Sequence, residues 1–527
     1  MINRFTITFL FLLLFSFTLS AQLVNNGGII IVKNGATLHV DSDVTNTTGT
    51  LQLEANATLE VSGDFTSESA AIFDADANSL VKFFGSASKN IKSGGDDFGK
   101  ILMNKDAAVN MALVDAMDIT TNLDFTTANG NKLILGANKL TLASGATVTN
   151  YDASHYVQAD GTGTLEKRYA AAGTFTFPIG DTDDYSPIDV NVTGGTLGTN
   201  AAIAVKVTDA VHPNKYSDAD AYITRYWNVD ATDITSLAAT LTGTYTDGDV
   251  TGTEANIKGA SYTSDWDFSN ASGDAANNTV TGDISDDADF TGMNYYGKMA
   301  SLKAFLQGPY SGGTMTTTLN TNNLIPLSTP YTTTYSSDET VTSIPANITD
   351  WIKIEIRDAG DASSVLKSYS KFIKNDGQIY ELDGSSAPKF KDAPTSGYVA
   401  VRHRNHLGIR TSSALDFTTN PSHDFTTASS QAYGTDPMKE VATGVWAMWS
   451  GNPNGDDMVK YNGSSSDRVK ILIKVGFSTP NNIVSGYFDE DVNMDGDVKY
   501  NGSSNDRVKV LLNVGFSTPN NIIYEQL

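Results

Sequence analysis

The C-terminal part of the chain contains the same segment twice. MVKYNGSSSDRVKILIKVGFSTPNNIV at 458–484 recurs as DVKYNGSSNDRVKVLLNVGFSTPNNII at 497–523. Aligned without gaps from Met458 and Asp497, the copies match at 21 of 29 positions, with a repeat distance of 39 residues. Shared composition does not produce this identity, so the copies form two tandem structural units.

The second copy is preceded by side chains typical of a calcium loop. Asp491, Asn493 and Asp495 occupy loop positions one, three and five, where side-chain oxygens converge on a hard divalent cation. Gly496 at position six permits the sharp turn with positive φ, and Asp497 at position seven can offer its backbone carbonyl. The sequence therefore predicts a Ca²⁺ site in this loop.

This loop is longer than that of an EF-hand. An EF-hand closes with a bidentate acid at position twelve, but that position is Gly502 and the next acid is Asp506. Residues 506–515 (DRVKVLLNVG) have apolar residues at helical spacing and end in a glycine suited to a C-terminal cap. Two compatible roles remain open for Asp506: the helix N-cap and the closing calcium ligand.

The first copy predicts a weaker calcium site, because it has fewer carboxylates and Asp457 stands where the second copy has glycine. A solvated turn of Asn, Asp and Gly without an ion is the alternative for both loops. The candidate ligands of the first loop are Asn452, Asn454, Asp456, Met458 at position seven, and Asp467 as the closing acid.

The paired units, each a loop followed by one helix, resemble a divergent type I dockerin, the calcium-dependent module that docks onto cohesin domains. The resemblance covers residues 451–527 and departs in a four-residue insertion (YNGSSNDR) and in the acid-poor first loop. It implies that residues 446–527 form a calcium-binding module whose partner is a cohesin-like or other surface protein.

The other end of the chain predicts the compartment. Residues 1–21 have one basic residue, a short apolar run and a small residue, Ala21, as in a cleaved secretory signal. We expect a secreted or cell-surface protein with no transmembrane helix in the mature chain. The net charge of -25 and pI near 4.5 argue against nucleic acid and anionic membranes as partners. The absence of cysteine excludes a disulfide framework.

Between the two ends, the pattern favours an all-β fold. Thr, Asn, Gly, Asp and Ser dominate between short alternating apolar runs, and helix-period segments are rare outside the C-terminal repeats. ATLHVDSDVT at 36–45 returns as ATLEVSGDFT at 57–66, 21 residues later. This spacing suits one coil of a solenoid, so residues 22–160 are predicted to form a parallel β-helix or a related β-roll.

Some β-helices are polysaccharide lyases or hydrolases, so the acids of this region raise the question of catalysis. We expect them in turns or on outward positions, where a solvated face explains them better than an active site. The acids concerned are Asp41, Asp43, Glu60 and Asp64.

Residues 161–310 and 311–445 contain short strands separated by turn residues, which predicts two β-sandwiches, the second Ig-like. Trp227 is expected in a sandwich core, with a sugar-stacking platform as the alternative. The turn at 181–184 (DTDD) has the acids of a calcium site but neither a glycine nor a following helix.

The strand DWIKIEIRDA at 350–359 alternates between isoleucines and charged residues. Lys353, Glu355 and Arg357 share one face, which we interpret as the polar side of a half-buried strand.

A cluster of basic residues, RHRNH at 402–406, follows in a second predicted strand. His403 and His406 take opposite faces of an extended strand, so they chelate one metal only where the strand ends or bulges. A hydrogen-bonded structural corner between strands is the expected role, with a metal site and a carboxylate-binding patch as alternatives.

The middle of the chain resembles large adhesin-like or haemagglutinin-like surface proteins of Gram-negative environmental bacteria, through GTLEKRYAAAGTFTFPIGD, LIPLSTPY, DWIKIEIRDA and VRHRNHLG. That group supports location and architecture rather than a mechanism. The motifs of serine, cysteine, zinc and nucleotide-dependent enzymes are absent, and no catalytic residue is predicted. The expected function is a secreted, non-enzymatic adhesion or scaffold protein. The alternative is a polysaccharide-degrading enzyme or cellulosome-like component with the β-helix as its catalytic module.

Overall fold

The computed structural model describes residues 22–125, 130–334 and 339–527, so the predicted signal peptide lies outside the described residues. The chain is mostly β, with 48% of residues in strands and 7% in helices. It divides into two compact units. The first runs to Asp267 and includes Ser272–Met293, and the second consists of Phe268–Ala271 and Asn294–Leu527.

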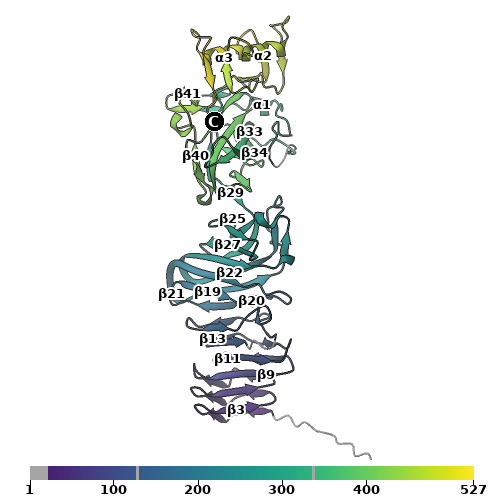
Figure 1. The fold of residues 1–527 in the computed structure, drawn as a ribbon, viewed down its shortest axis with the longest axis vertical. Helices are drawn as coiled ribbons and strands as arrows, with labels where there is room; N and C mark the ends of the chain where they lie inside the picture. Colours follow the sequence, from purple (N-terminus) through teal and green to yellow (C-terminus); the bar gives the residue numbers. More distant parts are fainter. Residues whose placement is uncertain (1–21, 126–129, 335–338) are drawn as a thin grey trace, which may run out of the picture. The chain divides into compact units, whose positions relative to one another are not determined.

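The first unit begins with a β-solenoid of about seven turns, which confirms the β-helix prediction (Figure 1). Successive coils pair in parallel, and Leu23, Val44 and Phe65 are partners at the predicted 21-residue spacing. One sheet of the solenoid consists of β1 (Leu23–Asn25), β4 (Val44–Asn46), β7 (Phe65–Ser67), β10 (Lys89–Lys92), β12 (Met111–Leu113), β14 (Lys132–Ile134), β17 (Tyr156–Gln158) and β20 (Ile179–Gly180).

Two further faces complete the coils. The first three coils contribute a third strand each, and later coils run between two faces. The short face consists of β2 (Ile29–Val32), β5 (Thr50–Leu53) and β8 (Ile72–Ala75). The long face contains β3 (Thr37–Val40), β6 (Thr58–Val61), β9 (Leu80–Gly85), β11 (Asp97–Lys105), β13 (Met117–Phe125), β15 (Leu140–Leu142), β16 (Thr147–Thr149) and β18 (Leu165–Arg168).

Alternation of apolar and polar residues determines which side chains fill the solenoid. In β6, Leu59 and Val61 are fully buried. Thr58, which precedes them, and Glu60, which lies between them, face outward. The rings of Phe65, Phe73 and Phe98 pack against one another inside the coils, with centroids 4.9–5.3 Å apart. Each inward side chain therefore contributes to a core that continues from one coil to the next.

The same core extends into a group of antiparallel strands. β18 pairs with β21 (Ile188–Thr208), which pairs along its length with β22 (Tyr222–Thr244). The unit also contains β19 (Gly173–Phe177), β23 (Val250–Thr251), β24 (Ile257–Tyr262), β25 (Trp266–Asp267), β26 (Ser272–Asp274), β27 (Thr279–Ile284), β28 (Ala288–Asn294) and the 3-10 turns η1 (Asp247–Asp249) and η2 (Glu254–Asn256).

The second unit is built on an antiparallel sheet with β33 (Ile348–Asp358) between β34 (Val365–Lys374) and β37 (Ser396–His403). Its remaining strands are β35 (Ile379–Tyr380), β38 (His406–Arg410) and β39 (Leu415–Asp416). Around it lie β29 (Tyr296–Lys298), β36 (Lys389–Lys391), β30 (Ser301–Lys303), β40 (Ser422–Asp424), β31 (Tyr310–Ser311), β32 (Thr314–Met315), β41 (Lys439–Ala442), β42 (Val445–Ala447), α1 (Thr318–Thr321), η3 (Phe417–Thr419) and η4 (Ser429–Gln431).

The charged face of β33 is covered, so its interpretation as the polar side of a half-buried strand is wrong for Glu355 and Arg357. Both residues are at most 5% exposed, and the Arg357 guanidinium lies 2.6 Å from the Glu355 carboxylate. Arg402 on β37 pairs with the same carboxylate at 3.1 Å and with Glu525 at 3.1 Å. Glu525, which follows the second repeat copy, thus reaches this face through Arg402.

The two C-terminal copies fold as a reciprocal pair. Helices α2 (Asp467–Val475) and α3 (Asp506–Val514) contact each other (Figure 1). Strand β43 (Met458–Lys460) of the first copy pairs with β46 (Ile522–Tyr524) of the second. Strand β45 (Asp497–Lys499) of the second copy pairs with β44 (Ile483–Ser485) of the first. Each copy therefore completes the other.

None of the helices in the described residues is long and apolar enough to cross a membrane.

Candidate metal centre

The second predicted loop wraps around Asp491. The side chain of Asp491 is fully buried, and its two oxygens accept hydrogen bonds from the backbone N–H groups of Asp495 at 3.1 Å and Gly496 at 2.9 Å. Gly496 has a φ of 91°, which supplies the turn that the sequence predicts at position six. The loop backbone is therefore folded around its first predicted ligand.

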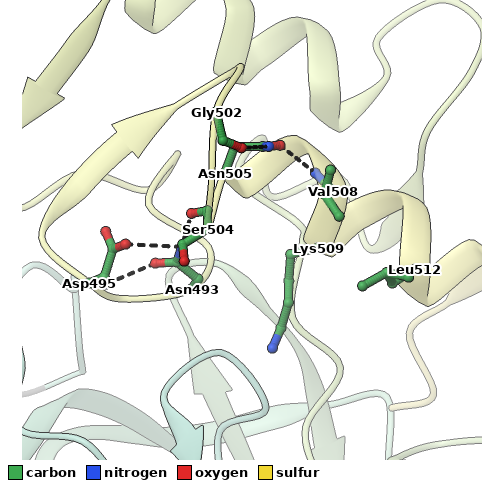
Figure 2. Close-up of a pocket in the computed structure, with 8 residues that line it drawn as sticks. All are labelled: Asn493, Asp495, Gly502, Ser504, Asn505, Val508, Lys509 and Leu512. Atoms are coloured by element: carbon green, nitrogen blue, oxygen red, sulfur yellow. Dashed lines mark hydrogen bonds between the residues drawn. The ribbon is translucent and has the colours of Figure 1, made fainter.

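The side chains at positions three and five lie beside each other at the rim of this loop. The amide of Asn493 donates to the Asp495 carboxylate at 3.3 Å and to the Ser504 carbonyl at 2.7 Å (Figure 2). The Asp495 carboxylate also lies 3.3 Å from Nζ of Lys499. Within the described residues, no group of three or more His, Cys, Asp or Glu side chains has the arrangement of a metal site.

Asp506 turns back into the loop. Its buried carboxylate accepts hydrogen bonds from the N–H groups of Val492 at 2.9 Å and Lys499 at 2.8 Å. The N-cap of α3 is Asn505, whose side chain accepts from Val508 at 3.0 Å. The N-cap interpretation of Asp506 is therefore wrong, because the inserted residues place Asn505 at the cap and leave Asp506 free to face the loop.

The first loop reproduces some of these contacts and differs at its closing acid. Oδ2 of Asp467 accepts from the N–H of Lys460 at 2.6 Å, as Asp506 does from Lys499. Its other oxygen has no donor, whereas Oδ1 of Asp506 has two; the shorter of those two bonds is lost because Pro453, which has no N–H, takes the position of Val492. Oδ1 of Asp467 is thus buried without a hydrogen-bond partner, and so is Oδ1 of Asp456 in the same loop.

The remaining predicted ligands lie in the loops as the sequence places them. Asn452 and Asn454 both accept from the N–H of Asp456, at 3.2 and 3.3 Å. Met458 and Asp497 each begin the strand that follows the loop, and the Asp497 carboxylate accepts from Ser485 at 2.6 Å. The Asp497 side chain is therefore engaged elsewhere, and only its carbonyl remains as a candidate ligand.

Burial changes the acidity of the three innermost acids. Burial raises the pKa of Asp491 to about 7 and the pKa of Asp467 and Asp506 to about 8. Neighbouring carboxylates add to this, Asp456 beside Asp467 and Asp491 beside Asp506. A buried carboxylate is costly unless it is paired or coordinates a metal, and a divalent cation in either loop would offset that cost.

The four-residue insertion forms one wall of a groove beside the second loop (Figure 2). The groove has a volume of about 490 Å³ and lies between the loop, the inserted residues and one face of α3. Gly502, with a φ of 95°, and Ser504, with a φ of 54°, make the extra turn that returns the chain to Asp506. The residues that line the groove are Asn493, Asp495, Gly502, Ser504, Asn505, Val508, Lys509 and Leu512.

The basic cluster at 402–406 forms a buried turn between β37 and β38, which confirms the predicted structural corner. Nδ1 atoms of His403 and His406 lie 3.0 Å apart, and Nε2 of His403 lies 3.1 Å from Asp350. Arg404 pairs with Asp350 at 3.1 Å and donates to the carbonyl of Phe488. Ring nitrogens of both histidines are engaged in hydrogen bonds, and burial lowers the pKa of both rings.

Sequence reasoning missed the contacts that join this corner to distant parts of the chain. Tyr487 donates to Asp350 at 2.8 Å, and Asn405 contacts the beginnings of both predicted calcium loops. Tyr487, Asp350 and the loop residues that Asn405 contacts lie far from the basic cluster in sequence, so neither spacing nor periodicity could have identified these contacts.

Other sequence candidates have structural partners. Trp227 is fully buried and donates to the carbonyl of Ser186 at 2.9 Å, as expected of a core residue. The turn at 181–184 faces the buried guanidinium of Arg225, which pairs with Asp184 at 3.2 Å and also with Asp181. Arg225 therefore supplies the positive charge that a calcium ion bound in this turn would otherwise provide.

Three of the four solenoid acids are engaged in contacts between coils, and Asp41 is exposed. Glu60 lies 2.6 Å from His39 and 3.0 Å from Lys82, on the outward face. The Asp43 carboxylate accepts from the N–H of Asp64 at 2.8 Å, and Asp64 accepts from the N–H of Asn90 at 2.8 Å. These contacts connect one coil to the next.

No family model, no curated protein and no solved structure matches this chain.

Proposed function

We propose that the C-terminal repeats bind two calcium ions, one in each loop, and that this binding stabilises a dockerin-like module at residues 446–527. The observation that carries the proposal is in the first loop. Oδ1 of Asp467 and Oδ1 of Asp456 are buried there without any hydrogen-bond donor. Buried polar atoms are normally satisfied, and two unsatisfied carboxylate oxygens in one loop fit the ligand preference of a hard cation.

The ligand sets follow from the positions in each loop. In the second loop Asp491, Asn493, Asp495 and Asp506 offer side-chain oxygens, and Asp497 offers its carbonyl. The carboxylate of Asp495, which lies beside Nζ of Lys499, would turn from Lys499 to the calcium ion. In the first loop the equivalent ligands are Asn452, Asn454, Asp456, Asp467 and the carbonyl of Met458.

The same proposal covers the whole chain. The protein acts as a secreted or cell-surface adhesion or scaffold protein, after cleavage near Ala21. Residues 161–310 and 311–445 serve as β-sandwich modules, and the repeats attach to a cohesin-like or other surface protein. The long parallel faces of the solenoid offer repeated outward side chains suited to an extended partner such as an extracellular polysaccharide.

Calcium titration of the full mature chain tests the metal proposal. After removal of calcium with a chelator, isothermal titration calorimetry should show two bound ions, with dissociation constants of roughly 10⁻⁴ to 10⁻³ M as in extracellular modules. Asp467→Asn and Asp506→Asn should each retain one ion, because each removes the closing acid of one loop. Absence of calcium heat in the wild type at millimolar calcium would exclude the proposal.

Asp497→Asn is the matched control. Its side chain binds Ser485 and only its carbonyl is a proposed ligand, so this variant should keep both ions. Loss of one ion in Asp497→Asn would show that local charge, rather than the proposed ligand set, determines binding.

Incubation with pectic and alginate polymers tests the non-enzymatic part of the proposal. The expected result is no new reducing end and no unsaturated product. Either product would favour the polysaccharide-degrading alternative and would identify the solenoid as its catalytic module.

A further inference from the structure

A single residue of the neighbouring sheet contacts both predicted calcium loops. Asn405, at the turn between β37 and β38, is fully buried. Its backbone carbonyl accepts hydrogen bonds from the N–H groups of Gly451 at 3.0 Å and Asn452 at 3.1 Å. Its side-chain amide donates to the carbonyls of Asp491 at 2.7 Å and Asp489 at 3.2 Å.

These contacts reach equivalent positions in the two copies. Asn452 is the first residue of the first loop and Asp491 is the first residue of the second, 39 positions later. Asn405 holds the first loop with its main chain and the second loop with its side chain. It therefore lies between the two loops and connects their first ligand positions.

The side chain of Asn405 is held in this orientation by a chain of hydrogen bonds. Nε2 of His406 accepts from the N–H of Gly308 at 2.9 Å, so the proton of the neutral ring is assigned to Nδ1. Nδ1 lies 2.8 Å from Oδ1 of Asn405 and 3.0 Å from His403. With Oδ1 directed at His406, the amide nitrogen is directed at the second loop.

We propose that Asn405 is a positioning residue for both loops and that it makes calcium binding to them cooperative. The inference rests on the proposed calcium function. An ion in one loop orders the backbone at its first position, and the shared asparagine transmits that order to the other loop. The second ion then binds to a loop that already has less conformational freedom to lose.

Calcium titration of the full chain, followed by calorimetry, tests the inference. The wild type should bind two ions with positive cooperativity. Asn405→Ala removes both side-chain hydrogen bonds to the second loop and should weaken that site by about fivefold or more, with loss of cooperativity. Unaltered cooperativity in this variant would overturn the inference and leave two-ion binding intact.

Tyr487→Phe is the control for a merely structural effect. It removes one buried hydrogen bond, to Asp350, from the same interface without touching a first ligand position. It should lower the melting temperature and keep the cooperativity of the wild type. If Tyr487→Phe and Asn405→Ala have the same effect on cooperativity, Asn405 has no special role.

Single-site variants test the coupling without any change at Asn405. With the first loop disabled by Asp467→Asn, the second loop should bind calcium more weakly than it does beside an occupied neighbour. Asp506→Asn should weaken the first loop by the same factor, because coupling between two sites is reciprocal. Equal affinities with and without the neighbouring ion would contradict the inference, whereas no binding at all in the wild type would refute the calcium proposal itself.

Discussion

At the scale of single residues, the two loops keep one backbone conformation with different side chains. Asp457 has a φ of 60° at the position where Gly496 has a φ of 91°. A left-handed conformation costs an L-residue roughly 1–2 kcal/mol, less for Asp and Asn, and costs glycine little. The first loop therefore carries strain that the second does not.

Exchanging these residues should change stability in opposite directions. Asp457→Gly relieves the strain and removes a side chain that is 70% exposed, so we expect stabilisation of up to about 1 kcal/mol. Gly496→Asp should destabilise, because it introduces the strain and its Cβ would meet Leu324 at 3.0 Å. Thermal unfolding of both variants in calcium checks this, and a lower melting temperature for Asp457→Gly would contradict it.

The buried histidines predict a loss of stability in acid. Burial lowers the pKa of His403 below its usual 6.5 and the pKa of His406 well below that value. Below pH 6.5 the unfolded chain takes up protons that the folded chain resists, so stability present above this pH is lost as the pH falls. The charged groups that act on these rings are Asp350, Arg404, Asp489 and Lys509.

We expect this source to destabilise the second unit progressively as the pH falls from 7 to 5, because only the unfolded chain takes up these protons readily. His406→Gln should reduce the dependence of the melting temperature on pH, whatever its effect at pH 7. His39→Gln is the control, because that ring is 55% exposed in the solenoid. Equal pH slopes in all three proteins would show that the buried rings do not titrate in this range.

At the scale of elements, the sequence predicted those structural features that follow from the periodicity of the residues. The 21-residue spacing predicted the coil length, and Glu60 was expected in a turn or on an outward position, as observed beside the buried Leu59. Gly496 likewise predicted a turn with positive φ at position six of the second loop, where its φ is 91°. These features are local, so neighbouring residues are enough to determine them.

The features of the fold and of the candidate site that the sequence did not predict depend on long-range packing. Alternation placed Glu355 and Arg357 on one face of β33 but could not show that this face is buried or that Glu525 reaches it through Arg402. The pairing of β43 with β46 joins segments more than 60 residues apart. The loss of one donor to Asp467 follows from Pro453, whose effect is visible only once the closing acid is known to turn back.

Adjacent substitutions in β6 test the inward and outward alternation. Leu59→Ala removes a fully buried side chain and should cost about 2–5 kcal/mol through lost burial and a cavity. Glu60→Ala removes a partly exposed ion pair with Lys82 and should cost less than about 1 kcal/mol. Differential scanning calorimetry of the full chain measures both, and comparable losses would contradict the observed direction of these side chains.

At the scale of the whole molecule, the proposed calcium ions lie in only one of the two compact units. Calcium that binds only the folded state stabilises it by about 2.7 kcal/mol at one hundred times the dissociation constant. A chelator should therefore lower the melting transition of the second unit and leave that of the solenoid unit unchanged. Calorimetric scans with and without chelator check this, and an equal shift of both transitions would show that the ions act elsewhere.

The reciprocal strand pairing also has a consequence for the order of events during synthesis. Strand β43 of the first copy has its partner in Ile522–Tyr524. The first loop can be translated completely, with all its ligands, and still lack a neighbour for the strand that follows it. About sixty further residues must be synthesised before β43 can pair with β46, so the first copy can complete its strand pairing only together with the second.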